Sequence, residues 1–137
     1  MKYRIAVLLF LFFFFFINAQ TVIRGPYFQM VTTTSIYIQW RTSSLTNSRV
    51  WYGDAPNNLN QILSSGTNVT NHSILITGLT PNTTYYYAVG NSSGQMVGGT
   101  ENHYFKTSPP SNTNQTIRAW VLGNAGNDFN DQTAVRD

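Results

Sequence analysis

Residues 21–107 alternate between apolar and polar side chains in short runs, and clusters of Gly, Pro, Asn and Ser separate the runs. Ile36, Ile38 and Trp40, for example, alternate with Tyr37 and Gln39, which places the two sets on opposite faces of a strand. No stretch of this region has helical periodicity. The pattern therefore predicts an all-β fold, an immunoglobulin-like antiparallel sandwich of about seven strands.

The expected strands are short, and turn-forming segments at residues 53–58 and 91–94 separate some of them. We expect strands at residues 27–28, 36–40, 49–52, 74–76, 85–89 and 104–106, with a weak additional strand at residues 61–63. The chain contains no Cys, which excludes a disulfide scaffold, a thiolate zinc site and a cysteine nucleophile. Core packing and backbone pairing alone must therefore hold the sandwich together.

The first 19 residues differ in composition from the rest. Lys2 and Arg4 precede an apolar run of 13 residues from Ile5 to Ile17, and Ala19 is a small residue at which a peptidase can cut. This pattern is typical of a secretory signal peptide, since a membrane span needs about 20 apolar residues. We predict a signal peptide at residues 1–19, a secreted, periplasmic or extracellular location, and no membrane association after cleavage.

Removal of the signal also changes the charge. Without Lys2 and Arg4, six basic side chains remain against five acidic ones. Nucleic-acid binding needs Lys and Arg clustered on one face, so we expect no nucleic-acid partner.

A change of composition marks the end of the sandwich. Residues 108–116 are Ser, Pro, Asn, Thr and Gln, which indicates a linker. Residues 117–122 then resemble a buried strand, 123–127 a Gly-bracketed turn, and 128–137 the start of a helix. Such a unit cannot bury its own apolar face, so residues 117–137 are predicted to begin a second domain.

The polar residues of the sandwich do not form a catalytic pattern. His72 and His103 are the only histidines and are expected to be surface or strand-edge residues. Asp54 and Glu101 lie in expected loops, where they are solvated. The many Ser and Thr residues have no local base, so we predict no catalytic residue in this region.

The aromatic residues divide into two sets. Tyr85 and Tyr87 are expected in the core, whereas Tyr37, Trp51 and Tyr86 are expected to point outward. Exposed aromatic residues mark contact surfaces. We interpret the outward set as an interface with the following domain; a carbohydrate-binding platform is the alternative.

Residues 78–89 carry a recognisable pattern. Leu79, Pro81, Thr83 and Tyr85 form a Leu-x-Pro-x-Thr-x-Tyr sequence that resembles a strand-to-strand corner of fibronectin type III domains. The resemblance implies that the Tyr85 hydroxyl bonds back to the backbone a few residues upstream. Trp40 is similarly placed to the core Trp of that family.

A narrower resemblance covers residues 21–137. Residues 24–29, the Trp40 strand, residues 50–53, the 79–89 corner and residues 105–107 together resemble the N-terminal domain of purple acid phosphatases. In that family a metallophosphoesterase domain comes next and opens with a strand and a Gly-Asp-x-Gly turn, to which residues 121–126 are similar. The resemblance implies a catalytic domain as the partner of residues 21–107.

The resemblance also implies a metal site outside the sandwich. The family hydrolyses phosphate monoesters with a water held on two metals, iron together with zinc, manganese or a second iron. Its first metal ligand is the Asp of the turn, and Asn124 occupies that position here. Asn offers only a neutral oxygen to a hard cation. Taken on its residues alone, Asn124 is a turn residue between Gly123 and Gly126.

These patterns support three hypotheses. The first is a non-catalytic accessory domain of a secreted phosphatase-like enzyme. The second is a free-standing binding module for glycans or proteins. The third is part of a pseudoenzyme, because Asn124 replaces the metal-binding Asp.

Overall fold

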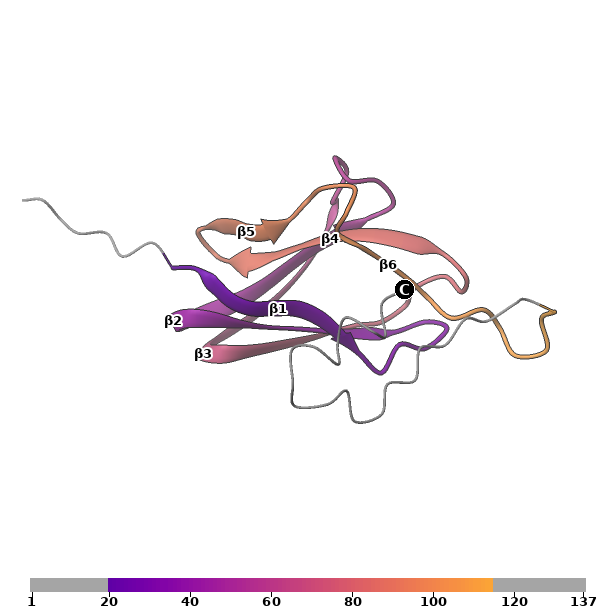
Figure 1. Cartoon of the computed structure of the whole chain (residues 1–137), viewed down its shortest axis with the longest axis horizontal. Helices are drawn as coiled ribbons and strands as arrows, with labels where there is room; N and C mark the ends of the chain where they lie inside the picture. Colours follow the sequence, from indigo (N-terminus) through magenta and orange to yellow (C-terminus); the bar gives the residue numbers. More distant parts are fainter. Residues whose placement is uncertain (1–19, 115–137) are drawn as a thin grey trace, which may run out of the picture.

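The computed structural model describes residues 20–114 (Figure 1). The predicted signal peptide at 1–19, residues 115–116 of the linker, and the predicted second-domain segment at 117–137 lie outside the described residues. The structure is all-β, and its six antiparallel strands are β1 (Val22–Gln29), β2 (Ile36–Gly53), β3 (Gln61–Ile76), β4 (Thr84–Asn91), β5 (Gly94–Gly98) and β6 (Tyr104–Lys106). The predicted fold class is therefore confirmed. Within residues 20–114, no helix is long and apolar enough to span a membrane.

Strand β2 organises the sheet. Its first half pairs with β1, its second half pairs with β4, and β3 accompanies it on the other side along most of its length. β5 and β6 pair with β4. The sheet curls, so that inward side chains from both halves meet in one hydrophobic core. A single curled sheet thus forms the two layers of the sandwich.

Two pairs of predicted strands are joined in the structure. Residues 36–40 and 49–52 both belong to β2, which is 18 residues long, and residues 61–63 and 74–76 both belong to β3, which is 16 residues long. The connecting residues contain no proline, and in β2 no glycine, so nothing interrupts the extended backbone. Register shifts around Thr46 bend the pair instead. The expected count of about seven strands becomes six.

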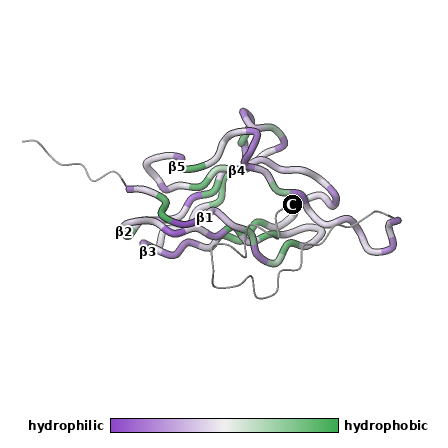
Figure 2. Tube along the Cα trace, in the orientation of Figure 1, coloured by the Kyte–Doolittle hydropathy of each residue, from purple (hydrophilic) through white to green (hydrophobic). Residues whose placement is uncertain are grey.

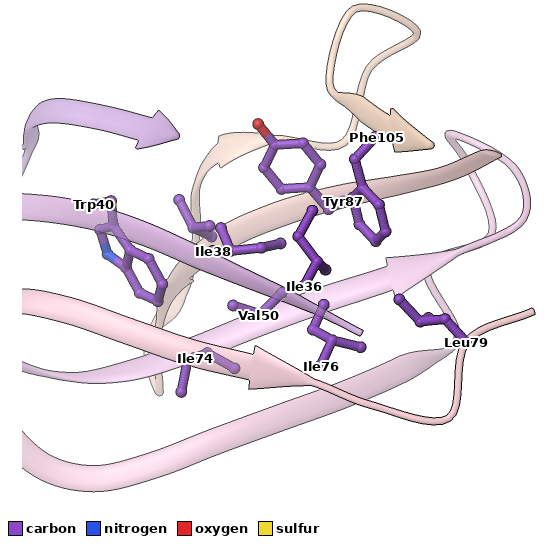
Figure 3. Close-up of a cluster of buried hydrophobic side chains, with 10 residues drawn as sticks. Ile36, Ile38, Trp40, Val50, Ile74, Ile76, Leu79, Tyr87 and Phe105 are labelled. Atoms are coloured by element: carbon purple, nitrogen blue, oxygen red, sulfur yellow. The ribbon is translucent and has the colours of Figure 1, made fainter. Parts of the chain in front are cut away.

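Alternation along the strands produces the core. Ile36, Ile38 and Trp40 are buried from β2, and Ile74 and Ile76 are buried from β3. Figure 3 shows this cluster, with Trp40 near one end and Leu79 at the other. Each fully buried Ile stabilises the fold by about 1.5–3 kcal/mol relative to an exposed one. Figure 2 shows hydrophobic stretches on the strands near β4 and β5, while β3 near its label is largely hydrophilic.

Aromatic rings fill the half of the core where β4 and β6 meet. Phe105 packs edge-on against Phe28 at a centroid distance of 5.7 Å and stacks on Tyr85 at 5.6 Å. Phe28 also meets Tyr87 edge-on at 5.2 Å. These contacts join β1 to β4 and β6 across the sandwich, and each such pair adds about 0.5–1.5 kcal/mol beyond its buried area.

Candidate functional site

The strand-to-strand corner lies between β3 and β4. Leu79 is buried in the core, and the Thr80 backbone N–H donates to the Tyr85 hydroxyl oxygen at 3.0 Å. This is the hydrogen bond expected for a fibronectin-type corner. The Thr83 hydroxyl donates to the carbonyl oxygen of Pro81 at 2.9 Å, which tightens the turn. The corner is a structural element, because its polar groups satisfy one another.

The chain leaves the sandwich beside this corner. The buried Thr107 hydroxyl donates to the Thr80 carbonyl oxygen at 2.6 Å and accepts from the Thr83 N–H at 2.9 Å. The Ser108 N–H donates to the Thr32 carbonyl oxygen, and the Asn82 N–H donates to the Ser108 carbonyl oxygen. Ser108 is therefore the last residue tied to the sandwich by these backbone bonds.

Exposed apolar side chains lie next to the point where the chain leaves the sandwich. Met30 is 74 % exposed and Val31 is 42 % exposed, and both lie directly before Thr32, the residue that anchors Ser108. Met30 has a φ of 50°, a left-handed conformation that is uncommon for a residue with a side chain. We call Met30, Val31, Asn82 and Ser108 the exit surface. An exposed apolar group at the point where the chain continues is suited to contact with a neighbouring domain.

A pocket of about 400 Å³ opens at the same end of the sandwich. Tyr52, Tyr85, Asp54, Asn60 and Gln61 contribute side chains to its lining. Burial raises the pKa of the Tyr52 hydroxyl above its ordinary value, and the neighbouring Tyr85 adds to the rise. The Tyr52 hydroxyl is therefore protonated at neutral pH. Asp54 supplies the single carboxylate among the residues that line the pocket.

Two of the predicted contact residues lie together. Trp51 on β2 pairs with Ala88 on β4, and Tyr86 lies two residues before Ala88 on the same outward face. Tyr104 on β6 pairs with Tyr86, at a ring centroid distance of 6.2 Å, and Ile62 on β3 pairs with Trp51.

We call Trp51, Ile62, Tyr86 and Tyr104 the aromatic patch. Ile62 and Tyr104 are each 55 % exposed, whereas Trp51 and Tyr86 are half-buried. The Arg49 guanidinium lies over the Trp51 ring at 5.7 Å from its centroid.

Tyr37 does not join this patch. It pairs with Gln29 on β1 and with Leu75 on β3, in the other half of the curled sheet. Tyr37 and Trp51 share the outward face of β2, but the curl separates them. The structure thus provides one cluster from Trp51 and Tyr86, and a separate half-buried Tyr37.

His72 differs from its prediction. It lies on an edge strand, but its side chain is only 2 % exposed, so the expectation of a surface residue is wrong. Its ring stacks on Trp40 at a centroid distance of 4.7 Å and an interplanar angle of 8°. Burial lowers the pKa of His72. Alternation carried a signal for this burial, because His72 lies on the same face of β3 as the buried Ile74 and Ile76, but the prediction did not use it.

Two hydroxyl groups fix the tautomer of His72. The Thr42 hydroxyl donates its proton to the Ser44 carbonyl oxygen at 2.8 Å, so it must accept from Nε2–H of His72, also at 2.8 Å. The Ser48 hydroxyl then donates to Nδ1 at 2.8 Å. The neutral ring is fully hydrogen-bonded. Among the buried side-chain polar atoms of the described residues, Trp40 Nε1 alone has no partner.

The described residues offer no metal centre. No group of three or more His, Cys, Asp or Glu side chains within residues 20–114 could hold an ion. Asp54 and Glu101 are exposed, and His103 is partly buried and bonds to the Thr100 hydroxyl at 2.7 Å. Asn124, the predicted first ligand position, lies outside the described residues.

Solved structures with similar folds are β-sandwich domains. The sensor domain of the anti-sigma factor RsgI4 of Pseudobacteroides cellulosolvens is 21 % identical, covering 72 % of this chain and 97 % of that one, with a TM-score of 0.47. A fibronectin type III domain of human contactin 1 is 18 % identical, covering 66 % and 79 %, with a TM-score of 0.45. No curated protein sequence matches the chain.

One family matches by sequence. The model described as "Purple acid Phosphatase, N-terminal domain" matches residues 26–107, from the Pro in β1 to the Thr that closes the corner. The match includes Trp40, Leu79, Pro81 and Tyr85 and spans more than half of the chain. The chain therefore belongs to the family of purple acid phosphatase N-terminal domains.

Proposed function

We propose that residues 21–107 are a non-catalytic accessory domain of a secreted metallophosphoesterase, in which the complete protein hydrolyses phosphate monoesters. The family match over residues 26–107 carries this proposal. The described residues are compatible with it, because they offer no group of side chains that could hold a metal ion, and the Ser48 hydroxyl beside His72 is buried away from any substrate. We assign the chemistry to the domain that begins at residue 117.

The metal ions of the family do not fit the described sandwich. Its carboxylates, Asp54 and Glu101, are solitary and exposed, and the buried His72 already uses both ring nitrogens. A two-metal site needs several charged oxygen and imidazole ligands within a few ångströms. Iron with zinc, manganese or a second iron is therefore expected only in the following domain, with position 124 as one ligand position.

The accessory role is a docking role. The following domain is proposed to rest on the exit surface, where Met30 and Val31 are exposed beside the tethered Ser108. Burying these side chains provides a hydrophobic contact at the point of covalent connection. The aromatic patch extends towards the same end, because Tyr86 and Tyr104 lie close to the start of β4 and the start of β6.

A phosphatase assay tests the proposal. The coding frame after Asp137 is read first, and a stop codon directly there would overturn the proposal. A frame that continues is expressed in full and assayed on a phosphate monoester with added iron and zinc. We expect hydrolysis by the extended chain, an increase with Asn124→Asp because a charged oxygen replaces a neutral one, and none by residues 20–114. Inactivity of both extended chains would instead support the pseudoenzyme hypothesis.

A free-standing binding module is the second candidate function. The aromatic patch favours it, since four apolar or aromatic side chains share one outward face. Glycan binding to residues 20–114 that is lost in Trp51→Ala and kept in Tyr37→Ala would support this candidate over docking.

A further inference from the structure

The outer edge of β3 is unusually open. Among the described residues, β3 pairs only with β2, which leaves 16 residues with one unpaired backbone edge. Open edges are templates for pairing with another strand, and proteins protect them with charges, prolines, bulges or short length. Strand β3 contains no Lys, Arg, Asp, Glu or Pro.

The other edges of the sheet are protected. β1 contains Arg24 and Pro26, whereas register shifts do not distinguish the two edges, because β1 and β3 each have two against β2. β5 is 5 residues long, and β6 is 3 residues long and ends with Lys106. Among the edge strands of the described residues, only β3 combines length with a lack of charge. The difference points to an edge that is used for pairing.

The sequence of β3 is complementary to itself. A register shift near Thr46 divides β3 into residues 61–65 and 71–76, and it reverses the odd-even order of inward and outward side chains between them. The outward residues are therefore Ile62 and Ser64 in one part, and Ser73 and Leu75 in the other. Inward residues reverse likewise, with Leu63 in the first part and Ile74 in the second.

This reversal allows two copies of β3 to pair antiparallel with every face matched. Pairing 61 with 76 places Ile62 opposite Leu75 of the second copy and Ser64 opposite Ser73 of the second copy. Inward residues meet inward residues in the same register, as Leu63 does with Ile74 of the second copy. Without the register shift, a pairing that brings 62 opposite 75 would put one of the two on the wrong face.

We propose that β3 is the interaction surface for a second copy of this chain, joined antiparallel through residues 61–65 and 72–76 about a two-fold axis. Ile62 and Leu75, which are 55 % and 41 % exposed, then cover each other at both ends of the interface. No like charges meet, because the strand has none. The two-fold axis is perpendicular to the sheet at this edge. It keeps the outward faces of both copies on the same side of the joined sheet, and both sheets curl in the same direction.

Paired charges test the register. Ser64 and Ser73 are exposed, so lysine can be placed at both positions, where two like charges then lie opposite each other in each of the two equivalent pairs of the dimer. Ser64→Lys also removes the hydrogen bond from Arg49, and this loss is the same in the control that carries Ser73→Glu. We expect sedimentation velocity of the chain from Gln20 onwards to show a dimer, a monomer for Ser64→Lys with Ser73→Lys, and a dimer for Ser64→Lys with Ser73→Glu. A parent chain that stays monomeric at all concentrations overturns the proposal.

Cysteine substitution gives an independent readout, because the parent chain has no Cys. Under mild oxidation, a mixture of the Ile62→Cys and Leu75→Cys chains should form a disulfide-linked dimer between the two variants. Each variant alone should remain largely unlinked, because its own thiols are about 40 Å apart in this register. Equal linking of either variant alone would reject the antiparallel pairing. Circular dichroism of every variant confirms that the sheet is retained.

Discussion

The two ends of the sandwich are stabilised differently. At the end where the chain enters, buried hydroxyl, amide and imidazole groups form a hydrogen-bonded cluster around His72, Thr42 and Ser48. At the end where the chain exits, Phe105, Tyr85 and Leu79 pack as rings and aliphatic groups around the corner. One fold thus combines a polar end, built around a buried histidine, with an apolar end. The end with the apolar core is the one that carries the exit surface.

The largest effect is expected in the apolar end. Phe105→Ala removes the ring that contacts Phe28, Tyr85 and Tyr87, and it should lower the free energy of unfolding by about 3–5 kcal/mol. Urea denaturation of residues 20–114 measures this. Phe105→Leu, which keeps most of the volume, should cost clearly less; equal losses would show that the ring contacts are not the cause.

The polar end should respond to pH. His72 has a lowered pKa in the folded state, so the unfolded chain binds the proton more readily. The contribution of the neutral His72 to the free energy of unfolding is complete above the ordinary histidine pKa of about 6.5, and it declines as pH falls below that value. We expect the urea midpoint to drop between about pH 7 and pH 5.

A matched pair of variants assigns this pH dependence. His72→Gln should flatten it, because no imidazole is then left to take up a proton in the buried cluster. His103→Gln, at a partly buried loop position, should leave the dependence in place. A steep dependence that persists in His72→Gln would assign the effect to other groups.

The corner hydrogen bond contributes less. Tyr85→Phe removes the hydroxyl that accepts the Thr80 N–H and should lower the free energy of unfolding by about 0.5–1.5 kcal/mol. Tyr104→Phe serves as the comparison. It removes the hydroxyl of an exposed tyrosine and should change the free energy of unfolding very little. Similar losses in both variants would contradict a specific role of the corner bond.

The smallest effect on stability belongs to the exit surface. Met30→Lys and Val31→Ser change exposed side chains, so the isolated residues 20–114 should stay within about 0.5 kcal/mol of the parent. In the chain extended beyond Asp137, the same changes should separate one thermal transition into two. Calorimetry that shows no separation would remove the exit surface from the interface.

Apolar alternation was predictable from the sequence, whereas the hydrogen-bond partners of the buried polar groups were not. Ile36, Ile38, Trp40 and Tyr87 are buried as their periodicity indicated, because apolar burial depends on the local pattern. His72 lies on the same face as Ile74 and Ile76, but the hydroxyl groups that satisfy its buried ring lie 24 and 30 residues away, and no local pattern identifies them. The register shifts around Thr46 lie between Thr42 and Ser48, in the part of β2 that connects two strands predicted as separate.

The surface residues show a similar limit. Alternation placed Tyr37, Trp51 and Tyr86 as outward residues, yet it could not show that the curl of β2 puts Tyr37 in the other half. Tyr104 and Ile62 complete the aromatic patch through strand pairing, and only the register of the sheet brings them beside Trp51 and Tyr86. Met30 and Val31 were likewise recognised as an exit surface only because the structure places them beside Ser108, where the chain leaves the sandwich.

Metal content tests the assignment of this sandwich as an accessory domain most directly. Elemental analysis compares residues 20–114 with the chain extended beyond Asp137, both purified in the presence of iron and zinc. We expect the extended chain to retain iron with a second metal and residues 20–114 to retain none. Metal bound stoichiometrically to residues 20–114, or a folded extended chain without metal, would contradict the assignment of this sandwich as the accessory domain of a metallophosphoesterase.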